Sequence, residues 1–238
     1  MNVFCGIDIG GTSVKLALID EEGAILVTDS FPTRSELGPD VFLNTLANTI
    51  QAIMTNSNPD WQLTAIGIGC TGPVDINTGI VLNPYTLSGL EGMNLISEVQ
   101  KRLQLPIYLE NDSNTAHLGA VALYDEDTVS GNTLLITFGT GIGCSIRMGG
   151  ELFRTPGGIH PEIGHIPTGV STDVVCYCGK NNCMENLFSG TAINRDCIRF
   201  FDQTPEQVMN AVDDPEKMAY RESLIRALTN AITEMVGI

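Results

Sequence analysis

Basic residues are scarce in this chain. Its 238 residues include only 12 Lys and Arg against 28 Asp and Glu, and the net charge at pH 7 is −16. A surface of this sign repels a phosphodiester backbone and an anionic lipid headgroup. We therefore expect no nucleic acid partner and no membrane partner, and any phosphate must be held locally, by backbone amides or by a metal.

Long apolar runs are also missing. Hydrophobic residues make up 43% of the chain, but no run approaches the roughly 18 residues that a membrane span needs. The opening MNVFCGIDIGG has neither a basic segment nor a small-residue cleavage site, so no signal peptide is expected. The cysteines number seven, and without a secretory signal we expect cytoplasmic thiols or metal ligands instead of a disulfide framework.

Hydrophobic spacing predicts an α/β protein. Strands are predicted in NVFCGIDIGG, SVKLALID, AILVTDSF, TAIGIGCTG, GIVLNP and PIYLEND. Helices are predicted over residues 40–54, with an apolar face of Phe42, Leu46, Ile50 and Ile53, over 95–103 and 113–124, and in the last segment, with Leu224, Leu228, Ile232 and Met235 on one face. Four cysteines in strand-like or helix-like runs are predicted to be small buried hydrophobes, namely Cys5, Cys70, Cys144 and Cys197.

Two glycine turns are each flanked by predicted strands. Residues 10–12 have Asp8 before them and Lys15 after them, and residues 139–143 repeat the pattern near the middle of the chain. Glycine permits a close backbone approach, so successive amides can point at one anion. Neither turn fits a P-loop or a dinucleotide fingerprint, because no GK[ST] opens a helix and a strand follows. Plain hairpin turns are the alternative, but the hydroxyls inside both turns favour phosphate binding.

Asp112 lies where a predicted strand ends and a helix begins. Aspartate is a favoured N-cap residue, so a helix cap is one interpretation. A carboxylate at the end of a strand in a cleft is also well placed to accept a hydroxyl proton, so a general base is the other.

One histidine and three cysteines have the spacing H-x10-C-x-C-x4-C. They are His165, Cys176, Cys178 and Cys183. One imidazole and three thiolates suit tetrahedral zinc, and four protein ligands make the site structural. The alternatives are a disulfide to Cys183 and a catalytic cysteine with His165 as its base. Glu162 and Glu185 flank this segment; they are either exposed surface residues or carboxylates held by the metal loop to orient a polyol.

Together these segments resemble the ROK family of sugar kinases, within the actin/hexokinase-like ATPase superfamily. DIGGTSVK is similar to the family's first phosphate motif, ENDSNTA to its catalytic segment and FGTGIGCSI to its second phosphate motif. PGGIHPEIGH followed by CYCGKNNCME is similar to its sugar and zinc segment. The resemblance implies an α/β fold of two actin/hexokinase-like (RNase H-like) lobes around a cleft.

The resemblance also divides the chain. Residues 1–111 would form the N-terminal lobe with the first phosphate motif. Residues 112–238 would form the C-terminal lobe with the second phosphate motif and the zinc and sugar loop. In the family a further strand and an adenosine-contacting turn follow the helix that ends near Ile238, so the second lobe is expected to be C-terminally truncated.

The resemblance implies a cytoplasmic, ATP-dependent kinase whose substrate is a hexose or an N-acylhexosamine. It also implies that the protein can form a homodimer. It makes Asp112 the base that deprotonates the sugar hydroxyl. The implied sugar ligands are Asn83, Asn111, Glu162, His165 and Glu185. The residues implied to surround ATP and Mg²⁺ are Asp8, which would hold Mg²⁺ through water, and Gly10, Gly11, Thr12, Lys15, Thr140 and Gly141. The implied ligands of the structural Zn²⁺ are His165, Cys176, Cys178 and Cys183.

Two other functions remain alternatives. A catalytically inactive sugar- and zinc-binding fragment is one, since the adenosine-contacting part is expected to be missing. A sugar-responsive transcriptional regulator is the other, because part of the family consists of repressors. The net charge of −16 and the lack of a helix-turn-helix before Gly6 argue against the regulator.

Overall fold

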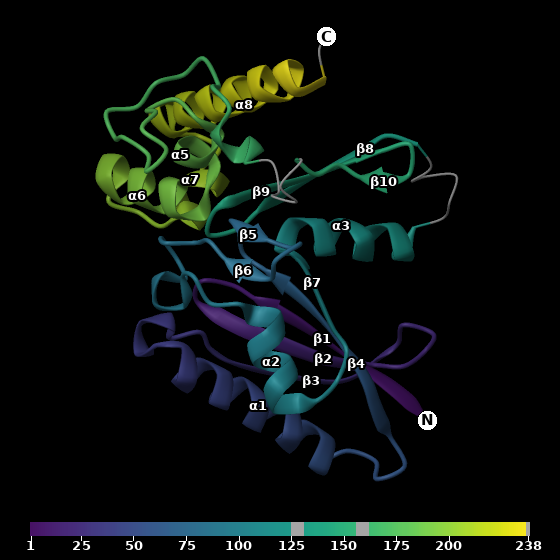
Figure 1. The fold of residues 1–238 in the computed structure, drawn as a ribbon. Helices are drawn as coiled ribbons and strands as arrows, with labels where there is room; N and C mark the ends of the chain where they lie inside the picture. Colours follow the sequence, from purple (N-terminus) through teal and green to yellow (C-terminus); the bar gives the residue numbers. More distant parts are fainter. Residues whose placement is uncertain (125–130, 156–161, 237–238) are drawn as a thin grey trace. The chain divides into compact units, whose positions relative to one another are not determined.

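The computed structural model describes residues 1–124, 131–155 and 162–236, and its fold is α/β as predicted (Figure 1). The chain divides into two compact units: unit 1 is Met1–Leu134 with Ser145–Pro161, and unit 2 is Leu135–Cys144 with Glu162–Ile238. The helix that begins at Asp112 belongs to unit 1, and the lobe boundary at residues 111 and 112 stays a prediction. The first six residues of the predicted sugar segment, 156–161, lie outside the described part.

Unit 1 is built on a five-stranded sheet in the order β3-β2-β1-β4-β7. Its strands are β1 (Asn2–Ile9), β2 (Ser13–Ile19), β3 (Ile25–Pro32), β4 (Gln62–Cys70) and β7 (Ile107–Asn111). The first three strands pair antiparallel, whereas β1, β4 and β7 run parallel. All five were predicted. The strand predicted in GIVLNP is reduced to β6 (Ile80–Val81), which pairs with β5 (Val74–Asp75).

Helices cover both faces of this sheet. On one face lie α1 (Pro39–Thr55) and α2 (Leu95–Leu103), which share one apolar core with the strands. The predicted apolar face of α1 is confirmed, since Phe42, Leu46, Ile50 and Ile53 are all buried. Side chains alternate along a strand, so Gly69 of β4 points to the opposite face. There α3 (Asp112–Leu123) packs so closely that Thr115 leaves no room for a Cβ on Gly69.

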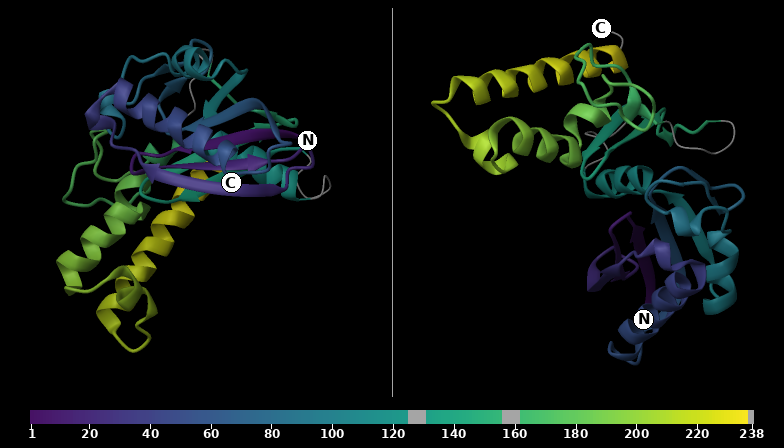
Figure 2. Two further views of the ribbon diagram at one scale, coloured as in Figure 1. Left: turned by 90° about the horizontal axis from the view of Figure 1, so that it is seen from below. Right: turned by 90° about the vertical axis from the view of Figure 1, so that its left-hand side faces the viewer.

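The second glycine turn joins β8 (Thr133–Phe138) and β9 (Ile142–Met148), and the chain passes between the units within these two strands. They belong to a three-stranded sheet in the order β10-β9-β8, with β10 at Glu151–Leu152. The helices of unit 2 are α5 (Met184–Phe188), α6 (Gly190–Phe201), α7 (Pro205–Asn210) and α8 (Pro215–Val236) (Figure 2). The core of unit 2 brings β9, α5 and α8 together.

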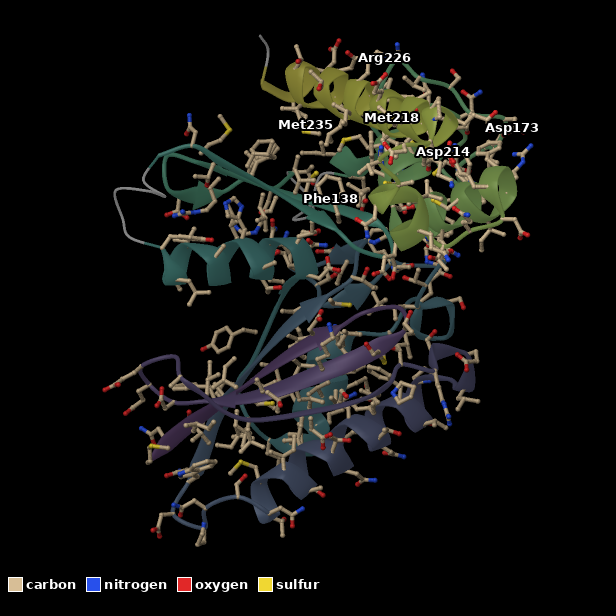
Figure 3. All side chains as sticks on the ribbon, turned by 180° about the vertical axis from the view of Figure 1, so that it is seen from behind. Phe138, Asp173, Asp214, Met218, Arg226 and Met235 are labelled. Atoms are coloured by element: carbon tan, nitrogen blue, oxygen red, sulfur yellow. The ribbon has the colours of Figure 1, made fainter. Side chains whose placement is uncertain are left out.

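The apolar face of α8 differs from the prediction at one position. Leu224 is buried and Met235, labelled in Figure 3, packs against the core, but Ile232 is 38% exposed. Ala227 and Ala231 are fully buried instead. At about 100° per residue, Ile232 lies about 80° around the helix from Leu224. The alanines lie nearer the centre of the face and allow α8 to approach the core closely.

The four cysteines predicted to be buried are confirmed, with exposures of 0–1% for Cys5, Cys70, Cys144 and Cys197. Among the described residues, none of the helices has both the length and the apolar character needed to cross a membrane.

Candidate functional site

The parallel strands of unit 1 bring the first glycine turn and Asp112 to one edge of the sheet. Ile9 of β1 is in register with Cys70 of β4, which is in register with Asn111 of β7. The residue after each of these positions therefore emerges at the same edge, as the geometry of parallel strands requires. The first glycine turn and the predicted base, far apart in sequence, therefore lie at one edge of the sheet of unit 1.

The first turn is held by residues that no motif in the sequence indicated. The Gly10 amide donates to the Ser13 carbonyl at 3.1 Å, and the Thr33 hydroxyl donates to the Gly10 carbonyl at 2.6 Å. A Cβ on Gly11 would lie 2.7 Å from the Cβ of Thr86, so a side chain cannot replace this glycine without moving the neighbouring loop. Two hydrogen bonds and close packing thus define the path of this turn, and glycine-rich backbone can bind anions.

Two charged side chains accompany this turn on neighbouring strands. Asp8 and Lys15 are paired across β1 and β2, and the Lys15 ammonium lies 3.8 Å from the Asp8 carboxylate. Both side chains are more than half exposed, so the ion pair contributes little stability. The pair offers one cation and one anion at the turn, which are the charges that the prediction assigns to phosphate and Mg²⁺ binding.

Asn83 supports the loop that packs against Gly11. It is 2% exposed, and its amide nitrogen donates to the Gly72 carbonyl at 2.5 Å and to the Thr86 hydroxyl at 2.8 Å. Its side-chain oxygen accepts the amides of Tyr85 and Thr86, both at 2.9 Å. Asn83 thus joins Gly72, two residues after the end of β4, to Thr86, and through Thr86 it supports the glycine turn. Its predicted contact with a sugar stays a prediction.

The cap of α3 is Asn111, so the interpretation of Asp112 as the cap is wrong. The side-chain oxygen of Asn111 accepts the amides of Ser113 at 2.9 Å and Asn114 at 3.3 Å. Asp112 is the first helical residue, and its carboxylate accepts the Ser113 amide at 2.8 Å. With the cap supplied by its neighbour, the Asp112 carboxylate is left for another role.

Burial raises the pKa of the Asp112 carboxyl, and the negative charge of Asp8 raises it further. Hydrogen bonds from Ser113 and Thr71 oppose the shift without cancelling it. Desolvation disfavours the charged form of a carboxyl group, and so does a second carboxylate nearby. A carboxylate with a raised pKa is a stronger proton acceptor than a solvated aspartate, which suits general base chemistry.

A buried polar network holds α3 behind Asp112, and no motif in the sequence indicated it. The Ser145 hydroxyl of β9 donates its proton to the Asn114 side chain at 2.6 Å. Because that proton is used, the Ser145 oxygen accepts from Nδ1 of His117 at 3.0 Å. Nε2 of His117 then accepts from Thr133 at 2.9 Å, and Asn114 donates to Glu110 at 3.0 Å. These bonds tie α3 to β7, β8 and β9 within unit 1 and fix the orientation of the helix that carries the base.

The second glycine turn is held by a carboxylate. The Gly139 amide donates to the Gly141 carbonyl at 3.0 Å, and the Ile142 amide donates to Glu185 of α5 at 2.5 Å. A Cβ on Gly141 would lie 3.0 Å from the same carboxylate. Burial raises the pKa of Glu185, against the Ile142 hydrogen bond. Glu185, predicted to bind sugar, therefore contacts the predicted phosphate turn.

A hollow of about 520 Å³ opens beside this turn, entirely within unit 2. Its lining consists of Gly139, Thr140, Gly190, Thr191, Asn194 and Arg195. The Thr191 hydroxyl donates to the Thr140 carbonyl at 3.1 Å, so the start of α6 is joined to the turn. Asp196 and Asn186 hold the Arg195 guanidinium in place. No motif in the sequence indicated the α6 residues, because a glycine followed by a threonine at the start of a helix is too common a pair to indicate a site.

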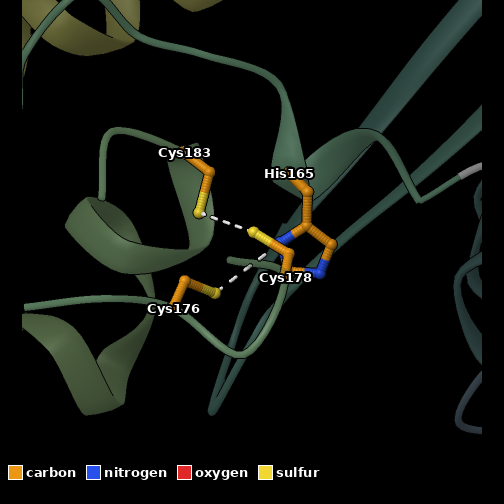
Figure 4. A group of neighbouring side chains, drawn as sticks. All are labelled: His165, Cys176, Cys178 and Cys183. Atoms are coloured by element: carbon orange, nitrogen blue, oxygen red, sulfur yellow. Dashed lines mark hydrogen bonds between the residues drawn. The ribbon is translucent and has the colours of Figure 1, made fainter. Parts of the chain in front are cut away.

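The four predicted metal ligands converge (Figure 4). The ligand atoms of His165, Cys176, Cys178 and Cys183 all lie within 4.8 Å of one another. The sulfurs of Cys178 and Cys183 are 3.8 Å apart, and Nδ1 of His165 is 3.9 Å from the Cys176 sulfur. A tetrahedron with Zn–S bonds of about 2.3 Å places its sulfurs about 3.8 Å apart, so the ligand set fits zinc.

Local backbone structure presents these ligands. The Cys176 amide donates to the Lys180 carbonyl and the Gly179 amide donates to the Cys176 carbonyl, both at 2.8 Å. Gly179 has φ +83°, a conformation that glycine adopts without strain. Burial lowers the pKa of His165, and the charge of Lys180 lowers it further, which favours the neutral imidazole that a metal requires.

His165 itself lies at the end of a short 3-10 helix, Ile163–His165, that follows the exposed Glu162. Gly164 packs against β9 so closely that a Cβ there would lie 2.6 Å from the Ile142 carbonyl. The predicted residues thus form two groups. Unit 1 holds Asp8, Gly10, Gly11, Thr12, Lys15, Asn83, Asn111 and Asp112, and unit 2 holds Thr140, Gly141, Glu162, His165, Cys176, Cys178, Cys183 and Glu185.

Known proteins are similar to this chain in sequence and in fold. Residues 4–238 match the sequence pattern of the ROK family. A glucokinase of Streptomyces coelicolor is 32% identical over 218 residues, which cover 90% of this chain and 65% of the relative. An N-acetylmannosamine kinase of Escherichia coli is 30% identical over 190 residues, covering 79% of this chain and 61% of the relative. The chain therefore spans less than two thirds of the length of these relatives.

One similar solved structure is a ROK family glucokinase of Streptomyces griseus in complex with glucose and AMPPNP. It is 29% identical, covers 96% of this chain and 74% of its own, and superposes with a TM-score of 0.70. The mixed α/β fold described above accordingly matches an actin/hexokinase-like kinase fold.

Proposed function

This chain belongs to the ROK family, and from that membership we propose that it transfers the γ-phosphoryl group of ATP to a hydroxyl of a hexose or an N-acylhexosamine. The names of its relatives support both acceptor classes, since they include glucokinases and an N-acetylmannosamine kinase. The bound AMPPNP and glucose of the Streptomyces griseus enzyme support ATP as the donor.

The observation that carries the proposal is the place of Asp112. It lies at the carboxyl edge of the parallel strands beside the first glycine turn, and burial raises its pKa. The carboxylate would accept the proton of the attacking sugar hydroxyl. The oxygen–phosphorus bond then forms as the bond to the β-phosphate oxygen breaks, and ADP leaves.

The two glycine turns would bind the phosphates. In unit 1 the contacts are assigned to Gly10, Gly11, Thr12 and Lys15. In unit 2 they are assigned to Thr140 and Gly141, beside the hollow that α6 lines. Magnesium prefers oxygen ligands and keeps several waters, so the exposed Asp8 carboxylate is the residue that would hold it. Magnesium would neutralise charge that develops on the phosphates.

Sugar binding is assigned to Asn83, Asn111, Glu162, His165 and Glu185. Zinc on His165, Cys176, Cys178 and Cys183 would be structural, because four protein ligands leave no open position. Its role would be to hold the loop that ends where α5 and Glu185 begin. The homodimer stays a prediction.

A coupled ADP-release assay on zinc-loaded protein tests this function with a panel of hexoses and N-acetylhexosamines. We expect sugar-dependent ADP formation with at least one of them and no ADP without sugar. Calorimetric titration of the same sugars accompanies the assay. Sugar binding without ADP formation would contradict the kinase and identify a binding protein, and a salt-sensitive complex with duplex DNA would instead support the regulator.

The activity should also depend on pH through the ionisation of the Asp112 carboxyl. A base works only when ionised, and the pKa of this carboxyl is raised. The ionised fraction therefore falls, as pH is lowered, at a higher pH than for an ordinary aspartate with a pKa of about 3.9. We expect kcat/KM to fall as the pH is lowered, with a midpoint above the pKa of an ordinary aspartate. A rate independent of pH down to about 4 would contradict the assignment.

A further inference from the structure

The two ring nitrogens of His165 have different neighbours. Nδ1 faces the Cys176 sulfur at 3.9 Å and belongs to the group of four ligand atoms. Nε2 lies 2.8 Å from the hydroxyl of Tyr177, the residue between the two cysteines of the C-x-C pair. The two rings meet edge to face with centroids 4.8 Å apart. The imidazole is therefore held from both sides by one short segment of the chain.

The chemistry of a metal-bound imidazole decides the direction of this hydrogen bond. When Nδ1 binds a metal, the neutral ring carries its proton on Nε2, so Nε2 donates and the Tyr177 oxygen accepts. A partner of this kind fixes the tautomer and the ring orientation of a metal-ligating histidine. The single N–H that His165 could offer to a sugar hydroxyl is then already engaged.

We propose that Tyr177 is the positioning residue of the zinc ligand His165, and that in this chain the Tyr177 hydroxyl makes the sugar contact that the family resemblance assigned to the His165 imidazole. The second part rests on the proposed kinase function. A phenolic hydroxyl can accept from His165 and still exchange a hydrogen bond with a substrate hydroxyl. The tyrosine is 56% exposed, so a ligand can reach it.

Tyr177 lies within the segment that carries three of the four candidate metal ligands, Cys176, Cys178 and Cys183. Glu185, one of the residues assigned to the sugar, follows Cys183 by two positions. The segment is also anchored at its ends, because Lys180 donates its ammonium to the His165 carbonyl at 2.9 Å. The phenol is therefore held against His165 by an anchored segment.

Tyr177→Phe removes the hydroxyl and keeps the ring, so it tests the proposal with little risk to folding. Zinc affinity is measured by competition with a chromophoric chelator, and the absorption spectrum of the cobalt-substituted protein reports the ligand geometry. Michaelis constants are measured for the sugar and for ATP. The control is Tyr108→Phe, which removes a hydroxyl from a tyrosine on β7 that is 68% exposed.

We expect Tyr177→Phe to bind zinc about 10- to 100-fold more weakly, the usual effect of losing such a partner, and to shift the cobalt spectrum. The Michaelis constant for sugar should rise by about tenfold, which corresponds to the loss of one hydrogen bond, with that for ATP unchanged. Tyr108→Phe should match the wild type in every measurement.

Wild-type zinc affinity in Tyr177→Phe would overturn the positioning role, and an unchanged Michaelis constant for sugar would return the sugar contact to His165. A wild-type chain that binds no zinc would overturn the positioning role together with the proposed zinc site. A zinc-loaded chain without turnover would overturn the kinase and the sugar contact. The zinc affinities of the two variants would still decide whether Tyr177 positions His165.

Discussion

Asp112→Asn is expected to lower sugar-dependent ADP formation by about 10²–10⁴-fold, the usual contribution of a general base. The amide cannot accept the hydroxyl proton, but its oxygen can still accept the Ser113 amide that the carboxylate accepts at 2.8 Å. The coupled ADP-release assay measures the effect. Because the substitution acts on proton transfer, kcat should fall while the Michaelis constants for sugar and ATP stay near their wild-type values.

Unfolding of the variant would not explain this loss. Burial raises the pKa of Asp112, so the ionised carboxylate is less stable in the folded protein than in the unfolded chain. Replacing it with a neutral amide should leave the unfolding temperature unchanged or raise it. Asp60→Asn is the matched control, since Asp60 is exposed in the same unit and should keep wild-type turnover. An Asp112→Asn variant with wild-type kcat would remove Asp112 from the mechanism.

Removal of zinc is expected to destabilise unit 2 strongly. Four ligands from one segment converge there, and structural zinc sites contribute free energy directly to folding. We expect a chelator to lower the unfolding temperature of the wild type by more than about 10 °C, and added zinc to restore it. Scanning calorimetry measures the shift.

Cys183→Ser tests which residues bind the metal. Its unfolding temperature should no longer respond to chelator or zinc, because one ligand is lost. Cys197→Ser is the control, since Cys197 is fully buried but outside the ligand group. It should lower stability and keep the full response to zinc. Activity should also fall when zinc is lost, because Cys183 directly precedes α5, which carries Glu185. Equal zinc responses in the two serine variants would refute the site.

Short-range patterns account for most of the fold that could be predicted. The alternating residues of β1, β2 and β4 have one side facing a core and the other facing a helix or solvent, so their period is visible in the sequence. The same holds for α1, whose four predicted apolar residues are all buried. Ile232 was misplaced because the periodic rule favours large apolar side chains, whereas the fully buried positions of α8 are the alanines Ala227 and Ala231.

The sequence by itself singled out the four candidate zinc ligands and the two glycine turns, since each is a local pattern of residue type and spacing, and the resemblance of ENDSNTA to a family motif singled out the candidate base. Only the tertiary structure decided what surrounds them. It made Asn111 the cap of α3, placed Glu185 on the Ile142 amide and joined His117 to Ser145. These last two contacts link residues 43 and 28 positions apart. A contact of this kind depends on how strands and helices pack, and packing over such separations leaves no period and no motif in one sequence.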